Sequence, residues 1–175
     1  MVMADLDDID DVARQLVSAG IDRGLTVSTA ESCTAGMVAA AIADIPGASE
    51  VLRGGAVTYC DAIKHKVLGV SEETLRRYTA VSSQTAQEMA EGSRRLFDTD
   101  VAVSLTGYAG PGGGTAEDPA GTVYIGLSSS RGHQVRRFQC AGTRNEVRRA
   151  AALEALRMLV EACGELPDPA SSVSD

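Results

Sequence analysis

The sequence predicts an α/β fold, namely a layered α/β/α domain with a mixed, largely parallel sheet. Segments with the alternating pattern of strands take turns along the chain with segments whose apolar residues repeat at helical spacing. Two neighbouring strand candidates near the C-terminal end predict an added antiparallel hairpin. With 175 residues, 44% of them hydrophobic, the chain is long enough to bury one core. We expect one domain over residues 1–165 and a disordered tail over residues 166–175, which are rich in Pro, Ser and Asp.

The first half predicts two strands, each preceded by a helix. Apolar residues from Leu6 to Val17 repeat at helical spacing, and we expect Gly20 to end that helix. A strand then runs over residues 25–29 toward Ser32, followed by an apolar helix over residues 37–45 and a second strand over residues 54–59.

The second half predicts helices first and a hairpin afterwards. We expect a short helix over residues 71–78 and a longer one, capped by Ser82 or Ser83, that includes Leu96. A strand over residues 100–106 and a loop over residues 107–119 follow.

The last third predicts a hairpin and a long helix. Residues 121–128 and 134–140 form the expected hairpin. Thr143 and Glu146 have capping-box spacing, and the helix that they begin should reach Cys163 and stop at Gly164.

Composition narrows the classes of function. The net charge of −8, from 16 basic and 24 acidic residues, opposes binding to nucleic acid phosphates, and two Phe, four Tyr and no Trp supply no base-stacking platform. The arginines of the C-terminal third other than Arg144 are interpreted as a solvated helix face and strand edge; these are Arg131, Arg136, Arg137, Arg148 and Arg149.

Location and metal binding are also constrained by composition. The acidic start lacks the features of a secretory signal and no apolar run is long enough for a bilayer, so we expect a cytoplasmic protein with no direct nucleic acid or membrane partner. The four cysteines are widely spaced and only two His occur, which predicts free thiols and no metal site. The cysteines are Cys33, Cys60, Cys140 and Cys163.

The segment from Ala30 to Gly36 is the first candidate site. Ser32, Cys33 and Thr34 lie where a strand passes into a helix, so unpaired backbone N–H groups there could hold an anion or stabilise an oxyanion. The alternative is that a hydroxyl merely caps the helix, which this segment alone favours.

Tyr59 and Lys64 form the second candidate. A lysine desolvated beside a serine can accept the hydroxyl proton during attack on a carbonyl. Considered alone, Lys64-His65-Lys66 is more typical of a solvated turn.

A glycine-rich segment after Thr106 is the third candidate, and Arg144 is the fourth. Five glycines allow a ligand to approach the backbone closely; they are Gly107, Gly110, Gly112, Gly113 and Gly114. The pattern fits neither a Walker A loop nor a dinucleotide-binding loop. A flexible excursion is the alternative, but the C-terminal end of a strand favours binding. Arg144 at a helix N-terminus could grip a phosphate or lie on the surface.

These segments occur in one order that resembles the CinA C-terminal domain family, whose members include nicotinamide-nucleotide amidases. The resemblance rests on residues 30–36, 59–70, 80–82, 106–114 and 121–124, together with Gly142-x-Arg144-x-x-Val147-Arg148, and covers about Asp10 to Cys163. It implies deamidation of nicotinamide mononucleotide to nicotinate mononucleotide and ammonia, without a cofactor, in a homo-oligomer. The alternative is a non-catalytic nucleotide-binding or regulatory module.

The resemblance also implies roles for individual residues. Ser32 would be the nucleophile, Lys64 the general base, and Tyr59 would orient Lys64 or relay a proton; Cys33 is the rival nucleophile. The substrate would be held by Cys33, Thr34, Gly36, Thr106, Gly107, Gly110, Gly112, Gly113, Gly114 and Arg144.

Three departures from the family pattern bear on these implications. Ala35 stands where the family usually has a second glycine, and Asp118-Pro119-Ala120 replaces the usual Lys-Pro-Val. Thr143 precedes Arg144 where an Asp is usual. None removes a proposed catalytic group, although the lost lysine is expected to weaken binding of an anionic substrate.

Overall fold

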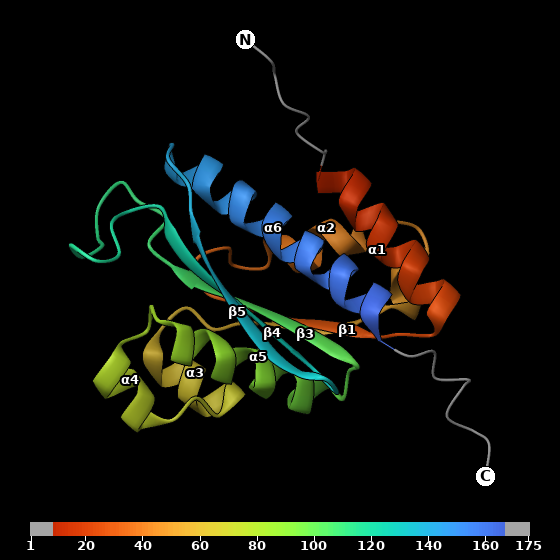
Figure 1. Ribbon diagram of the computed structural model, residues 1–175, viewed down its shortest axis with the longest axis horizontal. Helices are drawn as coiled ribbons and strands as arrows, with labels where there is room; N and C mark the ends of the chain where they lie inside the picture. Colours follow the sequence, from red (N-terminus) through yellow and green to blue (C-terminus); the bar gives the residue numbers. More distant parts are fainter. Residues whose placement is uncertain (1–8, 167–175) are drawn as a thin grey trace.

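The computed structural model describes residues 9–166. One five-stranded sheet, in the order β2-β1-β3-β4-β5, lies between two layers of helices (Figure 1). Helices α1, α2 and α6 cover one face, and α3, α4 and α5 lie on the other. The predicted layered α/β/α architecture is confirmed.

The elements follow one another as α1 (Ile9–Arg23), β1 (Val27–Glu31), α2 (Met37–Ala43), a 3₁₀ turn (Ala48–Glu50), β2 (Leu52–Val57), α3 (Asp61–Leu68), α4 (Glu72–Tyr78), α5 (Ser83–Phe97), β3 (Val101–Gly107), β4 (Thr122–Ser129), β5 (Gly132–Gln139) and α6 (Arg144–Glu165).

The sheet is mixed, with its parallel half at one side. Strand β1 pairs in parallel with both β2 and β3, whereas β3–β4 and β4–β5 are antiparallel. Parallel pairing therefore accounts for half of the strand pairs. Glu31 lies opposite both Val57 and Leu105, so the carboxyl ends of the three parallel strands meet at one edge. Open α/β sheets hold ligands at such an edge.

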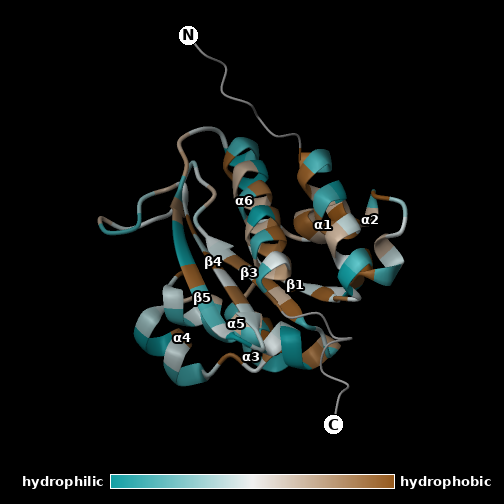
Figure 2. Ribbon diagram, turned by 45° about the vertical axis from the view of Figure 1, so that its right-hand side comes forward, coloured by the Kyte–Doolittle hydropathy of each residue, from teal (hydrophilic) through white to brown (hydrophobic). Residues whose placement is uncertain are grey.

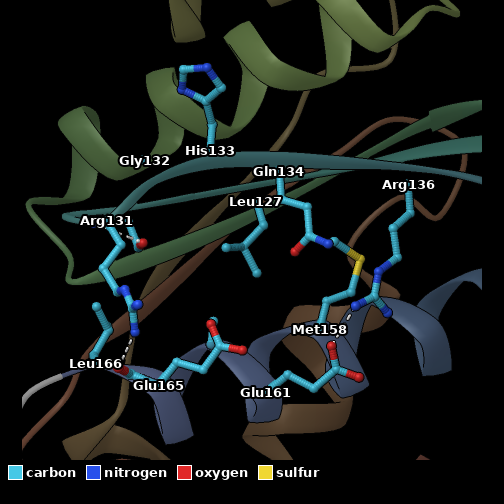
Figure 3. A pocket seen from close by; sticks show the side chains of 12 residues that line it. Leu127, Arg131, Gly132, His133, Gln134, Arg136, Met158, Glu161, Glu165 and Leu166 are labelled. Atoms are coloured by element: carbon cyan, nitrogen blue, oxygen red, sulfur yellow. Dashed lines mark hydrogen bonds and ion pairs between the residues drawn. The ribbon is translucent and has the colours of Figure 1, made fainter.

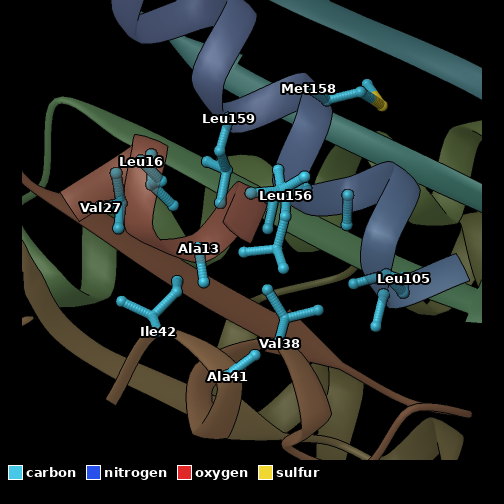
Figure 4. Close-up of a cluster of buried hydrophobic side chains, with 14 of the residues drawn as sticks. Ala13, Leu16, Val27, Val38, Ala41, Ile42, Leu105, Leu156, Met158 and Leu159 are labelled. Atoms are coloured by element: carbon cyan, nitrogen blue, oxygen red, sulfur yellow. The ribbon is translucent and has the colours of Figure 1, made fainter. Parts of the chain in front are cut away.

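The main core lies between the sheet and the layer of α1, α2 and α6. Figure 4 shows Leu16, Ile42 and Leu156 converging with Val27, and all four side chains are fully buried. Burying an aliphatic side chain of this size contributes roughly 1.5–3 kcal/mol relative to leaving it exposed. Hydrophilic and hydrophobic residues share α1 and α6 (Figure 2), which is typical of helices with one face on a core.

Alternation along β1 sends successive side chains to opposite layers. Val27 joins the core with α1, α2 and α6, whereas Ser28 hydrogen-bonds Ser93 of α5 on the other face. Glu31 lies four residues after Val27, and Ser32 lies four residues after Ser28. The same alternation therefore directs Glu31 toward α2 and Ser32 toward α3. The period of the strand thus separates two neighbouring polar side chains into different layers.

Helix α1 does not end at Gly20, as predicted, but continues to Arg23. A Cβ atom on Gly20 would lie 2.7 Å from either Cγ atom of Val51, so the glycine is required by packing. Gly24, with a φ of +61°, ends the helix, and the Leu25 N–H bonds the Gly20 carbonyl at 2.9 Å. Leu6, the expected start, lies outside the described residues.

Other boundaries differ by a few residues. Helix α6 passes through Gly164, and Leu166, assigned to the tail, is buried in the core; residues 167–175 lie outside the described range. Strand β5 begins at Gly132, two residues earlier than expected. Ser82, not Ser83, caps α5, since its Oγ accepts the Thr85 N–H.

Candidate active site

A cleft of about 250 Å³ lies at the carboxyl ends of the three parallel strands. Ser32 follows β1, Tyr59 follows β2, and Thr106 and Gly107 end β3. Lys64 reaches the cleft from α3, and Arg144 from the first turn of α6. The fold therefore gathers segments that are more than a hundred residues apart in the sequence.

Lys64 and Ser32 are hydrogen-bonded inside this cleft. Lys64 Nζ donates to Ser32 Oγ at 3.0 Å and to the Thr58 carbonyl at 2.9 Å. Lys64 is 1% exposed, which is unusual for a lysine. Burial lowers the pKa of Lys64, and the Asp61 carboxylate raises it in part. The environment therefore favours the neutral amine, the form that can accept a proton.

The segment after Ser32 is a turn that separates it from α2, which begins only at Met37. The carboxylate of Glu31 accepts hydrogen bonds from the N–H groups of Gly36, Val38 and Ala39 at 3.0–3.1 Å. Neither Ser32 nor Thr34 caps the helix. Glu31, which sequence reasoning missed, occupies the first donors of α2, so neither the favoured hydroxyl cap nor an external anion is found at these donors; the oxyanion alternative concerns the turn before α2.

Two backbone N–H groups of the turn have no hydrogen-bond partner in another residue. Within residues 9–166, no hydrogen bond joins the N–H groups of Cys33 and Thr34 to another residue. Their neighbour Ala35 donates its N–H to the Ser32 carbonyl at 3.1 Å. Of the two, Cys33 directly follows Ser32 and lines the cleft, so its N–H is the better placed to stabilise an oxyanion; Thr34 does not line the cleft.

The Cys33 thiol is less suited to nucleophilic attack than the Ser32 hydroxyl. Cys33 is buried, and burial raises the pKa of its thiol to about 11. A thiol is nucleophilic as the thiolate, and at neutral pH this environment keeps Cys33 protonated.

Tyr59 contacts Arg144 rather than Lys64. Arg144 donates to the Tyr59 hydroxyl at 2.8 Å and to the Gly110 carbonyl at 3.1 Å. The lysine amine bonds Ser32 and Thr58 instead. The expected orientation of Lys64 by Tyr59 is thus absent from this structure, and Tyr59 stands at the mouth, 57% exposed.

The glycine-rich segment forms the wall opposite Ser32 only in its first half. Gly107, Gly110 and Gly112 line the cleft, and a Cβ atom on Gly107 would lie 2.5 Å from the Thr122 carbonyl oxygen. Gly113 and Gly114 do not line it, and Gly114 instead bridges to Pro119.

Of the predicted substrate-binding residues, the cleft is lined by Cys33, Thr106, Gly107, Gly110, Gly112 and Arg144 but not by Thr34, Gly36, Gly113 or Gly114. Thr34 is fully buried, and the Gly36 N–H is bound to Glu31. The Thr106 hydroxyl donates to the Ala80 carbonyl at 2.6 Å and so holds the segment that carries Ala80 and Val81 against the site.

Sequence reasoning passed over several lining residues that lie inside the quoted motifs. Asp61 stands between Tyr59 and Lys64, and Tyr108 follows Gly107. Their place within a motif was the available signal. Arg148 was interpreted as part of a solvated helix face, but it donates to the carbonyls of Cys33 and Thr34.

The three departures have separate structural outcomes. Ala35 has a φ of +53°, a conformation that favours glycine. Asp118 accepts hydrogen bonds from Tyr124 and Arg137 and does not line the cleft, so it anchors the loop to the β4–β5 hairpin. Thr143 completes a capping box with Glu146 and begins α6.

A second cleft, of about 270 Å³, lies between the β4–β5 hairpin and the C-terminal half of α6 (Figure 3). Both of its arginines have partners: Arg136 pairs with Glu154 and Glu161, and Arg131 donates to the Glu165 carbonyl. None of the predicted site residues lines it.

The family model of the CinA C-terminal domain matches residues 9–163. The chain belongs to the CinA C-terminal domain family. A CinA-like protein of Endomicrobium trichonymphae is 46% identical over 155 residues, 89% of this chain and 36% of that protein. A CinA-like protein of Thermotoga maritima is 45% identical over 138 residues, 79% of this chain and 34% of that protein. This CinA-family chain thus spans about a third of the length of these relatives.

Solved structures agree with the assignment. The competence/damage inducible protein CihA from Agrobacterium tumefaciens is 40% identical with a TM-score of 0.87, covering 94% of this chain and 100% of its own. The competence damage-inducible protein A from Klebsiella pneumoniae is 35% identical with a TM-score of 0.88, covering 92% and 100%. The described part of this CinA-family chain contains no helix long and apolar enough to cross a bilayer.

Proposed function

We propose that this CinA-family chain is an amidohydrolase that converts nicotinamide mononucleotide into nicotinate mononucleotide and ammonia, with Ser32 as nucleophile and Lys64 as general base. The observation that carries the proposal is the hydrogen bond of 3.0 Å between Lys64 Nζ and Ser32 Oγ in a site where burial lowers the pKa of the lysine. A neutral amine beside a serine can take the place of the histidine of a catalytic triad.

In the first half of the reaction, Ser32 Oγ attacks the carboxamide carbon while its proton moves to Lys64 Nζ. The Thr58 carbonyl holds the amine in place throughout. Of the two candidate donors, the N–H group of Cys33 lines the cleft and stabilises the oxyanion, an effect typically worth about 10²–10³-fold in kcat for one donor. Lys64 then returns the proton to the amide nitrogen, the C–N bond breaks and ammonia leaves.

In the second half, water attacks the acyl ester and gives a proton to Lys64. The bond from carbon to Ser32 Oγ breaks, Lys64 reprotonates the serine, and the carboxylate product leaves. Tyr59 stands at the mouth with Arg144 and takes part in binding rather than in holding the lysine.

Charge supports a nucleotide that carries both signs. Besides Lys64, the ionisable acid and base that line the cleft as charged side chains are Asp61 and Arg144. Nicotinamide mononucleotide carries a cationic ring and an anionic phosphate. Arg144 suits the phosphate because a guanidinium can bind it in a forked arrangement, and Asp61 suits the ring.

The test is ammonia release from nicotinamide mononucleotide by the wild type, Ser32→Ala and Cys33→Ala. We expect Ser32→Ala to lose at least about 10³-fold in kcat, as removal of a nucleophile does in related chemistry. Full activity of Ser32→Ala, together with loss in Cys33→Ala, would reverse the assignment. Parallel assays with nicotinamide, its riboside and its dinucleotide determine which substrate is preferred.

The alternative is a non-catalytic nucleotide-binding or regulatory module. Thermal stabilisation by nicotinamide mononucleotide without ammonia release would support it over the amidase. A cytoplasmic location and a homo-oligomeric state remain part of the proposal, and sedimentation of the purified chain tests the second.

A further inference from the structure

Arg148, on α6, holds the turn that follows Ser32 by hydrogen bonds to its backbone; below, this pair of bonds is called the grip. Its Nε donates to the Cys33 carbonyl at 2.9 Å and its Nη2 to the Thr34 carbonyl at 3.0 Å. It lies on α6 one helical turn beyond Arg144, and its remaining donor reaches Asn145 at 3.4 Å. The guanidinium is half-buried and is directed at backbone rather than at solvent or a carboxylate.

The Cys33 carbonyl is the contact that matters. Thr34 O also accepts the Met37 N–H at 3.3 Å, so it has a second partner. Within residues 9–166, the Cys33 carbonyl has Arg148 as its hydrogen-bond donor and no other. The conformation of this peptide unit therefore depends on one side chain.

This contact lies beside groups that we propose for catalysis. Arg148 draws the Cys33 carbonyl toward α6, which covers one face of the sheet. Ser32 and Cys33 line the cleft, whereas Thr34 is fully buried and does not. The contact therefore fixes the backbone immediately after Ser32, at the residue whose N–H follows the proposed nucleophile.

We propose that Arg148 is a positioning residue of the amidase: it fixes the turn so that Ser32 Oγ and the Cys33 N–H keep their places in the cleft. The inference rests on the proposed function for the identity of the reaction, whereas the fixing of the turn is a property of the chain itself.

The inference can be tested with three variants on the same helix. Arg148→Met removes the grip, Arg148→Lys keeps the charge but offers a single ammonium for two carbonyls, and Arg149→Met is the control for loss of one positive charge on α6. For each we would measure kcat and KM for nicotinamide mononucleotide, and hydrogen exchange of a peptide that covers residues 32–36.

We expect Arg148→Met to lower kcat roughly tenfold to a hundredfold with KM within about twofold of wild type, because an oxyanion donor acts in the transition state. Arg148→Lys should recover only part of the rate, and Arg149→Met should match wild type. Exchange in residues 32–36 should quicken at least about tenfold in Arg148→Met, since the turn opens locally, and stay unchanged in Arg149→Met.

Three outcomes separate this inference from the proposed function. Unchanged exchange in Arg148→Met overturns it, with or without a known substrate. Faster exchange with a kcat equal to that of Arg149→Met also overturns it, because the grip would then be purely structural. No ammonia from wild type would count against the proposed substrate, while exchange would still decide whether Arg148 fixes the turn.

Discussion

The two clefts described above have nearly the same volume but differ in the partners of their charged side chains. In the cleft beside α6, Arg136 is held by Glu154 and Glu161, and Arg131 by the Glu165 carbonyl. In the cleft at the ends of the parallel strands, a buried lysine is paired with a serine instead of a carboxylate. The comparison teaches that a buried amine without a carboxylate partner, rather than hollow space, distinguishes the candidate active site.

Replacing the buried lysine gives the largest expected contrast between the clefts. Lys64→Met should lower the rate of deamidation about 10²–10⁴-fold, the usual contribution of a general base. Arg136→Met in the other cleft should leave kcat unchanged and cost at most about 1 kcal/mol, because the pair is partly exposed to solvent. Ammonia release and urea denaturation of both variants check this, and equal loss of activity would abolish the distinction.

Lys64→Met should increase the stability of the folded chain although it lowers the activity. Because the pKa of Lys64 is lowered in the folded state, the folded chain binds fewer protons than the unfolded chain. Its stability therefore rises with pH from the lowered pKa up to the ordinary pKa of lysine. Lys64→Met should raise the free energy of unfolding by about 1–2 kcal/mol at neutral pH. That gain should shrink as the pH approaches the ordinary value, and denaturation across pH measures it.

The charge of the cleft sets the pH dependence of the reaction. Because we propose neutral Lys64 as the base, we expect the rate to rise as pH increases through its lowered pKa. Asp61 raises the pKa of Lys64, so Asp61→Asn should move this rise to lower pH. A pH–rate profile of kcat/KM for both proteins is the measurement. An unmoved profile would show that Asp61 and Lys64 are uncoupled.

Protonation of the Cys33 thiol should give a smaller effect, which concerns its reactivity toward alkylating agents. With a pKa of about 11, roughly one Cys33 side chain in 10⁴ is ionised at pH 7. Iodoacetamide at that pH should therefore leave Cys33 unmodified, whereas the exposed Cys60 should react. Mass spectrometry of digested protein identifies the alkylated residue, and rapid alkylation of Cys33 would restore it as a candidate nucleophile.

The smallest effect concerns the backbone beside the nucleophile. Ala35 has a φ of +53°, so Ala35→Gly should raise the free energy of unfolding by about 0.5–1 kcal/mol. Ala39→Gly, in the first turn of α2, should instead lower it by up to about 1 kcal/mol. Urea denaturation compares the two, and a loss in both would mean that the turn is unstrained.

Most of the fold could be predicted because periodicity and capping are local. The strands, the capping box at Thr143 and the layered class follow from patterns within a few residues. The errors at Gly20 and Gly164 arise because a glycine can serve close packing or simply occur within a helix, and no local pattern separates these uses from a helix end. Gly20, for example, is explained by Val51, thirty-one residues away.

The site was predictable where residues share a motif and not where a contact crosses layers. Ser32 and Lys64 were expected to meet, and they do. Arg148 looked like surface because its partners are backbone carbonyls in another layer, which leave no mark in the sequence. Glu31 ends β1, and nothing in the strand pattern indicates that its carboxylate binds the start of α2.

The Glu31 carboxylate has a consequence for selectivity in a crowded solution. Free inorganic phosphate and small organic acids bind the unpaired N–H groups at exposed starts of helices. At the start of α2 the Glu31 carboxylate already accepts hydrogen bonds from these groups. Such ions therefore find no free donors at the start of α2, and any inhibition by phosphate should arise at Arg144, which we propose binds the phosphate of the substrate.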